Sequence, residues 1–148
     1  YRYDFELSDK LKLGVGATKT ITATVPGGVN VVDITGSIKA ATDSVIELDS
    51  GGSADTVMVL RLSGKLMLLL RSSIQLSGGL LPQNVLLYVK GSKCLLADLT
   101  LGAGTLLCSP GRIKTGRSVA WVGALQSDGK MMKIGDRTSV HYTPFSGF

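Results

Sequence analysis

Short apolar stretches separated by turn residues run through the whole chain, and most of them alternate apolar and polar positions. In Val45-Ile46-Glu47-Leu48, Ile74-Gln75-Leu76 and Met132-Lys133-Ile134 a polar residue separates two apolar ones. A period of two is typical of a β-strand that buries one of its faces. No segment keeps a helical apolar period with caps at both ends, so the pattern predicts an all-β fold.

Two parts of this pattern match each other when the first is moved along the chain until Gly36 coincides with Gly64. The segment Thr35–Gly51 then aligns with Ser63–Gly79, and a weaker third copy puts Gly91 at the position of Gly64. The aligned pairs are Gly36 with Gly64, Ile38 with Leu66, Ser44 with Ser72, Ile46 with Ile74, Leu48 with Leu76 and Gly51 with Gly79.

A second match, near the C-terminus, has a shorter offset, equal to the separation of Gly104 and Gly123. It aligns Gly104–Gly116 with Gly123–Gly135. The aligned pairs are Gly104 with Gly123, Leu106 with Leu125, Ile113 with Met132, Lys114 with Lys133 and Gly116 with Gly135. The chain therefore has two repeat lengths.

Repeats of this kind, each holding short strands and turn residues, are typical of the stacked coils of a parallel β-solenoid. The longer copies would be shorter coils with an added excursion at Asp49–Thr56 and at Ser77–Asn84. The alternative is a β-sandwich with coincidental glycine spacing. We predict one domain: an N-terminal strand or cap segment (residues 1–28), a solenoid with irregular coils (29–145) and a C-terminal tail (146–148).

The composition supports one core and excludes a membrane-spanning helix. The chain has 148 residues, of which 44% are hydrophobic, and Arg71 ends the apolar run Leu66–Leu70. A spanning helix needs roughly 20 apolar residues in succession. Residues 1–60 carry a net charge of −3 and residues 61–148 carry +8, with the cations scattered singly and no interleaved aromatic residues. This pattern predicts a solvated basic face and no nucleic-acid partner.

The order of the motifs resembles the bacterial ice-binding-like, or choice-of-anchor-like, family of secreted right-handed β-solenoids. The resemblance extends from Val29 to Phe145 through "VMVLRLSGK", "SSIQLSGGLLPQNVLLYVKGS", "GAGTLLCSPGRIKTGRSVAWVGAL" and "VHYTPF". The matching short motifs are Asn84-Val85 with Val89-Lys90-Gly91, Gly104-Thr105-Leu106-Leu107 and Gly123-Ala124-Leu125-Gln126. It implies an extracellular, right-handed solenoid of triangular section, often found in surface adhesins and sometimes binding ice.

Ice binding requires a flat array of threonines on several stacked coils. Only "ATKTITATV" has such a strand, with Thr18, Thr20, Thr22 and Thr24 on one face. Threonine is also a favoured strand residue, so a half-exposed edge strand is the alternative. An ice-binding or polysaccharide-binding face is thus the second functional hypothesis, after a structural or adhesive role.

No catalytic or metal site is predicted. The one histidine, His141, has no nucleophile or carboxylate partner in a recognisable motif, and Asp49–Asp55 lacks the alternation of a calcium loop. A solenoid lyase would need carboxylates beside basic residues on one face, and Arg112, Lys114 and Arg117 could contribute to one. We expect no enzyme activity, no metal and no cofactor.

Cys94 and Cys108 could face each other in adjacent coils. In an extracellular β protein we expect them to form a disulfide, and two buried free thiols are the alternative.

The first residues, "YRYDFEL", alternate Tyr1, Tyr3 and Phe5 with charged residues, so they can form an assembly strand that caps its own coil or completes a neighbour's. The segment lacks the features of a signal peptide, so secretion would need a leader outside this chain. We therefore expect a non-enzymatic, extracellular structural or adhesive cell-surface module. It would associate with itself, in filaments or a surface layer, or with other cell-surface proteins.

Overall fold

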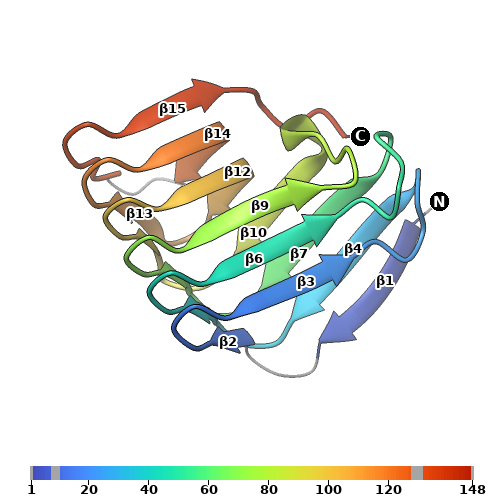
Figure 1. Ribbon diagram of the computed structural model, residues 1–148, viewed down its shortest axis with the longest axis horizontal. Coiled ribbons are helices and arrows are strands. Elements are labelled where there is room, and N and C mark those ends of the chain that lie inside the picture. The colour runs from blue at the N-terminus through green and yellow to red at the C-terminus, as the bar shows by residue number, and fades with distance from the viewer. Residues whose placement is uncertain (1, 8–10, 128–131, 148) are drawn as a thin grey trace.

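The computed structural model describes residues 2–7, 11–127 and 132–147, and it consists of strands that run parallel to their neighbours (Figure 1). The one helical segment in these ranges is a 3-10 turn, η1 (Pro82–Asn84). The predicted all-β class is confirmed. In the described ranges, no helix is long and apolar enough to cross a membrane. The strands are β1 (Arg2–Leu7), β2 (Leu11–Leu13), β3 (Thr18–Thr22), β4 (Val29–Ile34), β5 (Ile38–Ala40), β6 (Val45–Asp49), β7 (Val57–Leu62), β8 (Leu66–Leu68), β9 (Ser73–Ser77), β10 (Val85–Val89), β11 (Lys93–Leu96), β12 (Leu101–Cys108), β13 (Arg112–Thr115), β14 (Ala120–Ser127) and β15 (Ser139–Tyr142).

The strands form two curled sheets. The ten-stranded sheet follows the order β1-β4-β7-β10-β12-β9-β6-β3, and β14 and β15 continue it from β12. The five-stranded sheet has the order β13-β11-β8-β5-β2. Every pairing joins a strand to its counterpart one repeat later or earlier, so the chain returns to the same place in each sheet.

The strand registers reproduce both sequence repeats. Ile38 pairs with Leu66 and Ile46 with Ile74, which is the longer offset, whereas Gly104 pairs with Gly123 and Lys114 with Lys133, which is the shorter one. Residues 2–22 supply β1, β2 and β3, which pair with β4, β5 and β6, so they have the same strand order as the repeat that follows. The predicted alignments are thereby confirmed.

The two repeat lengths differ because β12 replaces two strands and a loop. In the longer repeats a loop, 50–56 or 78–84, separates the strand of one arm of the large sheet from the strand of the other arm. In contrast, β12 begins beside β9, where Leu101 pairs with Ser73, and ends beside β10. It bends at Gly104, whose φ of +106° favours glycine. Both predicted excursions are therefore loops that the shorter repeats lack.

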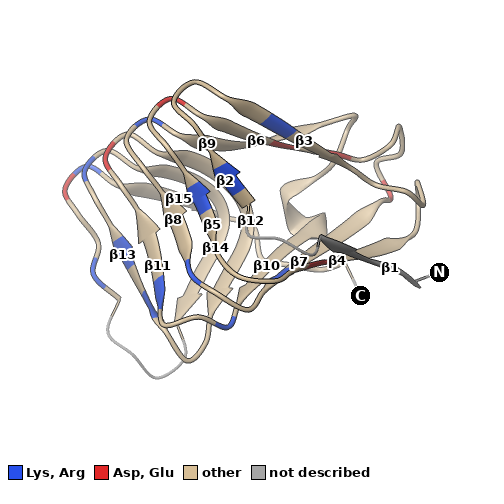
Figure 2. Ribbon diagram, turned by 90° about the horizontal axis from the view of Figure 1, so that it is seen from below, with Lys and Arg blue, Asp and Glu red and all other residues tan. Residues whose placement is uncertain are grey.

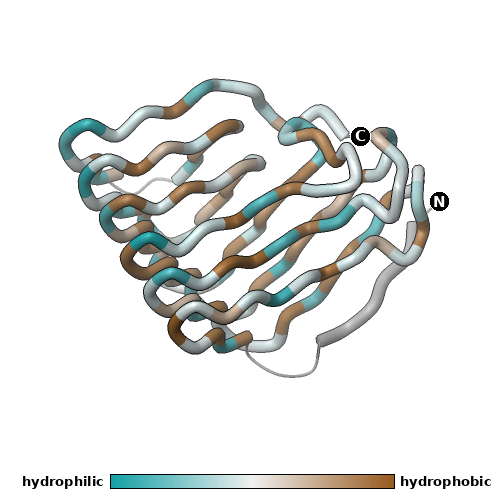
Figure 3. Tube along the Cα trace, viewed as in Figure 1, coloured by the Kyte–Doolittle hydropathy of each residue, from teal (hydrophilic) through white to brown (hydrophobic). Residues whose placement is uncertain are grey.

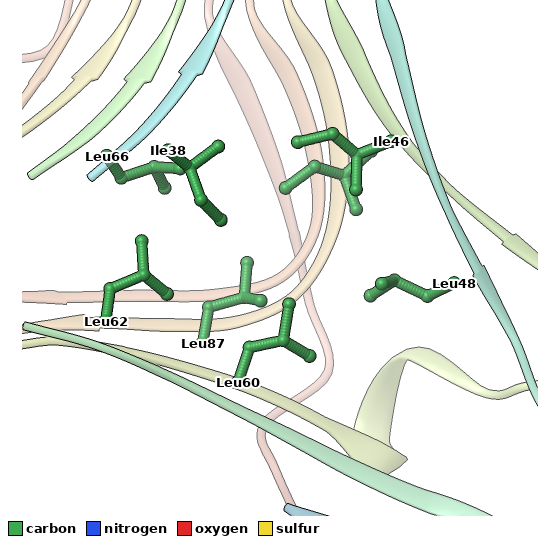
Figure 4. A pocket seen from close by; sticks show the side chains of 8 residues that line it. Ile38, Ile46, Leu48, Leu60, Leu62, Leu66 and Leu87 are labelled. Carbon is green, nitrogen blue, oxygen red and sulfur yellow. The ribbon is translucent and has the colours of Figure 1, made fainter. Parts of the chain in front are cut away.

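The core lies between the two sheets and is made of side chains that stack from repeat to repeat. Alternation of apolar and polar residues is visible along the strands in Figure 3. Eight core side chains from β5, β6, β7, β8, β9 and β10 surround a small cavity, and the seven that are labelled in Figure 4 point toward one another. The cavity among them has a volume of only about 10 Å³. This interior is a packed core and not a ligand pocket.

Glycines at the corner between the sheets allow the repeats to approach closely. A Cβ at Gly64 would meet the backbone of Gly36, one at Gly91 would meet the backbone of Gly64, and one at Gly111 would meet Gly91 and Ser92. These atoms belong to the backbone, so no side-chain rotation relieves the contact. The glycine repeat in the sequence thus reflects the spacing between stacked backbones.

We expect Gly91→Ala to lower the free energy of unfolding by about 1 to 3 kcal/mol, the usual cost of overpacking. Gly14→Ala is the matched control, because nothing lies within 4 Å of a Cβ at Gly14. Urea denaturation of both variants measures the difference. Equal stability of the two variants would contradict the role of the glycine corner.

Candidate functional site: a cationic face on the five-stranded sheet

The outer surface of the five-stranded sheet carries lysines at matching positions of successive strands. Lys12 of β2 pairs with Lys39 of β5, and at the far end Lys114 of β13 is bridged to Lys133. Met67 and Leu95 occupy the same row between them. A second row contains Lys93, which pairs with Arg112, and Lys65, which directly precedes the residue paired with Cys94.

We call these seven cationic residues the cationic face; they are Lys12, Lys39, Lys65, Lys93, Arg112, Lys114 and Lys133. All are exposed except Lys93, which is half-buried. The strands β2, β5, β8, β11 and β13 contain no aspartate or glutamate, as Figure 2 shows for this side. The whole chain has a net charge of +5 and this face supplies +7, so the rest carries −2.

The face places like charges directly opposite one another. Lys12 with Lys39, Lys93 with Arg112, and Lys114 with Lys133 are neighbours on adjacent strands, roughly 4.8 Å apart at the backbone. Such pairs destabilise a sheet. Among the residues that the structure describes, none of the seven side chains makes an ion pair that would offset this repulsion.

A neighbouring corner of the molecule shows the opposite arrangement. The stacked turns that follow the five-stranded sheet carry, in order, an acid, a base, an acid, a base and an acid, which alternate in Figure 2. We call this set the charged corner; it consists of Asp43, Arg71, Asp98, Arg117 and Asp136. Arg71 donates two hydrogen bonds to the Asp43 carboxylate, at 2.7 and 3.1 Å, and this contact lowers the pKa of Asp43. The same stacking therefore brings opposite charges together at the corner and like charges together on the cationic face.

The predicted threonine face is exposed but is one strand wide. Thr18, Thr20, Thr22 and Thr24 are all exposed. The strand beside them, β6, places other residues opposite three of these threonines. These opposite residues are Val45, Glu47 and Asp49. The threonines do not continue into an array.

The predicted assembly strand pairs within its own chain. β1 aligns in parallel with β4, with Tyr3 opposite Asn30 and Phe5 opposite Val32, which is the self-capping alternative. Tyr1 lies outside the described residues.

The two ends of the stack do not match each other. At the C-terminal end, Val140 pairs with the buried Trp121 at a core position but is 41% exposed, and all four residues of β15 are exposed. At the N-terminal end, the core position on β3 is Lys19, opposite the buried Ile46. Lys19 is itself exposed, and a charge at the open edge of a sheet opposes edge-to-edge pairing. A head-to-tail contact would have to bury the Lys19 ammonium, which opposes a filament.

The predicted disulfide is wrong: Cys94 and Cys108 are free thiols. Cys94 stacks between Leu66 and Ile113 on one sheet, and Cys108 pairs with Val89 on the other, so each thiol packs as a small apolar side chain. Both are fully buried. Burial raises the pKa of both thiols, and the contact with Cys108 raises the pKa of Cys94 further. This keeps the reactive thiolate scarce.

The one histidine and the one tryptophan of the chain lie in different environments. His141 is exposed on β15, opposite Val122. Trp121 is a core residue, 1% exposed, whose Nε1 donates a hydrogen bond of 2.7 Å to the carbonyl of Gly104. In the described ranges, no group of three or more His, Cys, Asp and Glu side chains is placed to hold a metal ion.

Sequence reasoning treated the cations as scattered and therefore missed the cationic face. The signal was present in the repeat alignment, where Lys114 matches Lys133 and Lys12 precedes Lys39 by close to the longer repeat length. It was hidden because Met67 and Leu95 interrupt the row, and because the two repeat lengths change the spacing. No protein-family description matches the chain, and no curated protein or solved structure is significantly similar to it.

We expect Ellman's reagent to detect no thiol in the native protein and two per chain in denaturant, without added reductant. The reaction of the native protein should accelerate little up to pH 9, because a raised pKa leaves both buried thiols protonated there. Reduced protein treated in the same way is the control. Fewer than two thiols in unreduced, denatured protein would contradict the free thiols and indicate a disulfide between Cys94 and Cys108.

Proposed function

We propose that this protein is a non-enzymatic, right-handed β-solenoid that acts as an adhesive module at the cell surface and binds an anionic polysaccharide. The observation that carries the proposal is the cationic face, whose seven cations lie in two rows over strands that contain no acid. Repulsion within the face costs stability, and a bound polyanion would offset that cost.

The solenoid assignment is supported by the strand registers. Each strand pairs in parallel with its counterpart one repeat away in both sheets, and the connections between paired strands pass through the other strands of the same repeat. Right-handed connections between parallel strands of one sheet are favoured in about 98% of cases. The shorter C-terminal repeats are coils of the same kind without the excursion.

A polysaccharide suits this surface better than a nucleic acid does. The strands under the face contain no aromatic residue on which a base could stack. The same surface is a sheet, with no helix among its elements that could enter a groove of duplex DNA. An extended sugar chain can lie along the two rows, and the half-buried Met67 and Leu95 give its rings an apolar contact.

The proposal predicts that removing three charges from the face weakens binding to dextran sulfate. Each lysine near an anionic surface contributes about 1 kcal/mol, so Lys12→Gln, Lys39→Gln and Lys114→Gln together should reduce affinity about 100-fold at low salt. Affinity chromatography and titration calorimetry at several salt concentrations measure the effect. Uncharged dextran should not bind.

The matched control removes three charges outside the face, with Lys19→Gln, Arg117→Gln and Arg137→Gln, all at exposed positions. It has the same net charge as the first variant but should bind dextran sulfate within about threefold of the natural chain, because screening weakens distant charges. Equal losses of affinity in the two variants would show that binding follows the net charge of the chain and not the cationic face, which would overturn the proposal. Tighter binding to duplex DNA than to dextran sulfate at equal ionic strength would also overturn it.

A further inference from the structure

One part of the cationic face differs from the rest because its side chains surround a depression. Ser92, Lys93, Arg112 and Lys114 line this open depression, which therefore has three cations and a hydroxyl group around it. Arg112 is the one arginine of the cationic face. Elsewhere on the face, Lys12 and Lys39 form a pair of simple ammonium groups.

The backbone fixes the relative positions of these groups. Lys93 and Arg112 are paired on adjacent strands, and Lys114 follows two positions along β13 on the same outer face. The corresponding backbone spacings are roughly 4.8 Å across the strands and roughly 6.6 Å along one strand. Side chains as long as those of lysine and arginine can therefore converge on one small anion.

Close stacking next to the depression holds Arg112 in place. Gly111 packs against Gly91 and Ser92 so tightly that a Cβ there would meet their backbone atoms at 2.6 Å. The Ser127 hydroxyl donates a hydrogen bond of 3.1 Å to the carbonyl of Gly111. On the other side of Arg112, the backbone amide of Thr115 donates a hydrogen bond of 2.8 Å to the backbone carbonyl of Lys133. The strand that carries Arg112 and Lys114 is thus anchored at both ends.

Resting on the proposed function, we infer that Ser92, Lys93, Arg112 and Lys114 form a subsite for a tetrahedral oxyanion, the sulfate or phosphate ester group of the bound polysaccharide. The guanidinium of Arg112 can donate two parallel hydrogen bonds to such a group. Lys93, Lys114 and the Ser92 hydroxyl can donate to the remaining oxygen atoms. A carboxylate has only two oxygens and leaves some of these donors without an acceptor.

The test compares three dextrans of equal length and charge density that carry sulfate, phosphate or carboxymethyl groups. The natural chain should bind at least one of the two ester forms about tenfold more tightly than carboxymethyl dextran, as expected for one added charge-assisted hydrogen bond to the third oxygen atom of the ester. The preferred ester identifies the group. Ser92→Ala keeps the charge but removes a donor that a carboxylate cannot use when both of its oxygens accept from Arg112, so it should reduce this preference to about twofold or less while carboxymethyl dextran binds as before.

Ser139→Ala, at an exposed position of β15, is the matched control and should leave the preference unchanged. Circular dichroism and urea denaturation verify that each variant is folded. Equal affinity of the natural chain for all three dextrans, or a Ser92→Ala variant that keeps the preference, overturns the subsite and leaves the proposed function intact. A natural chain that binds none of the three polymers overturns the proposed function itself.

Discussion

The structure depends on one constraint: the backbone of each repeat is hydrogen-bonded, strand for strand, to the backbone of the next. Because the register repeats, every residue stacks on its counterpart at the distance of neighbouring strands. A residue type is then acceptable only if it tolerates that neighbour. Inside, the constraint produces columns such as Ile38, Leu66, Cys94 and Ile113, all buried. At the corner between the sheets it admits glycine, since a Cβ at Gly91 would meet the backbone of Gly64.

On the outer surface the same constraint acts through charge, and the molecule shows two solutions. The charged corner alternates acids and bases, and its Asp43 and Arg71 side chains form an ion pair. The cationic face instead repeats one sign in three directly opposed pairs, which is unfavourable in the isolated chain. The corner shows that the fold can accommodate alternating charges one strand spacing apart. Departure from this local rule is typical of a binding surface, where a partner supplies the missing counter-charge.

The parts of the fold that were predictable depend on local spacing. Alternating residues such as those around Ile46 and Ile74 identified strands, and the glycine offsets identified both repeat lengths, because each signal lies within one or two repeats. The cationic face, in contrast, depends on the register of all the successive repeats. Aligning repeats two at a time does not show which residues share a row across the whole sheet, because the offset between repeats changes along the chain. The thiols were misjudged for a related reason. Spacing along the chain placed Cys94 and Cys108 near each other, but their burial in two apolar columns follows from the packing of both sheets.

The change of repeat length bears on where the cations gather. Where the repeats shorten, β12 spans both arms of the large sheet and the excursion loop disappears, while the five-stranded sheet continues with the same spacing through β11 and β13. Fewer residues per repeat then carry the same face, and four of its seven cations, from Lys93 to Lys133, lie in this part. The density of positive charge and the cost of like-charge repulsion are therefore greatest in the same repeats. If the proposed polyanion binds there, it stabilises the folded chain by mass action and relieves the largest repulsion first, which couples affinity and stability through the same side chains.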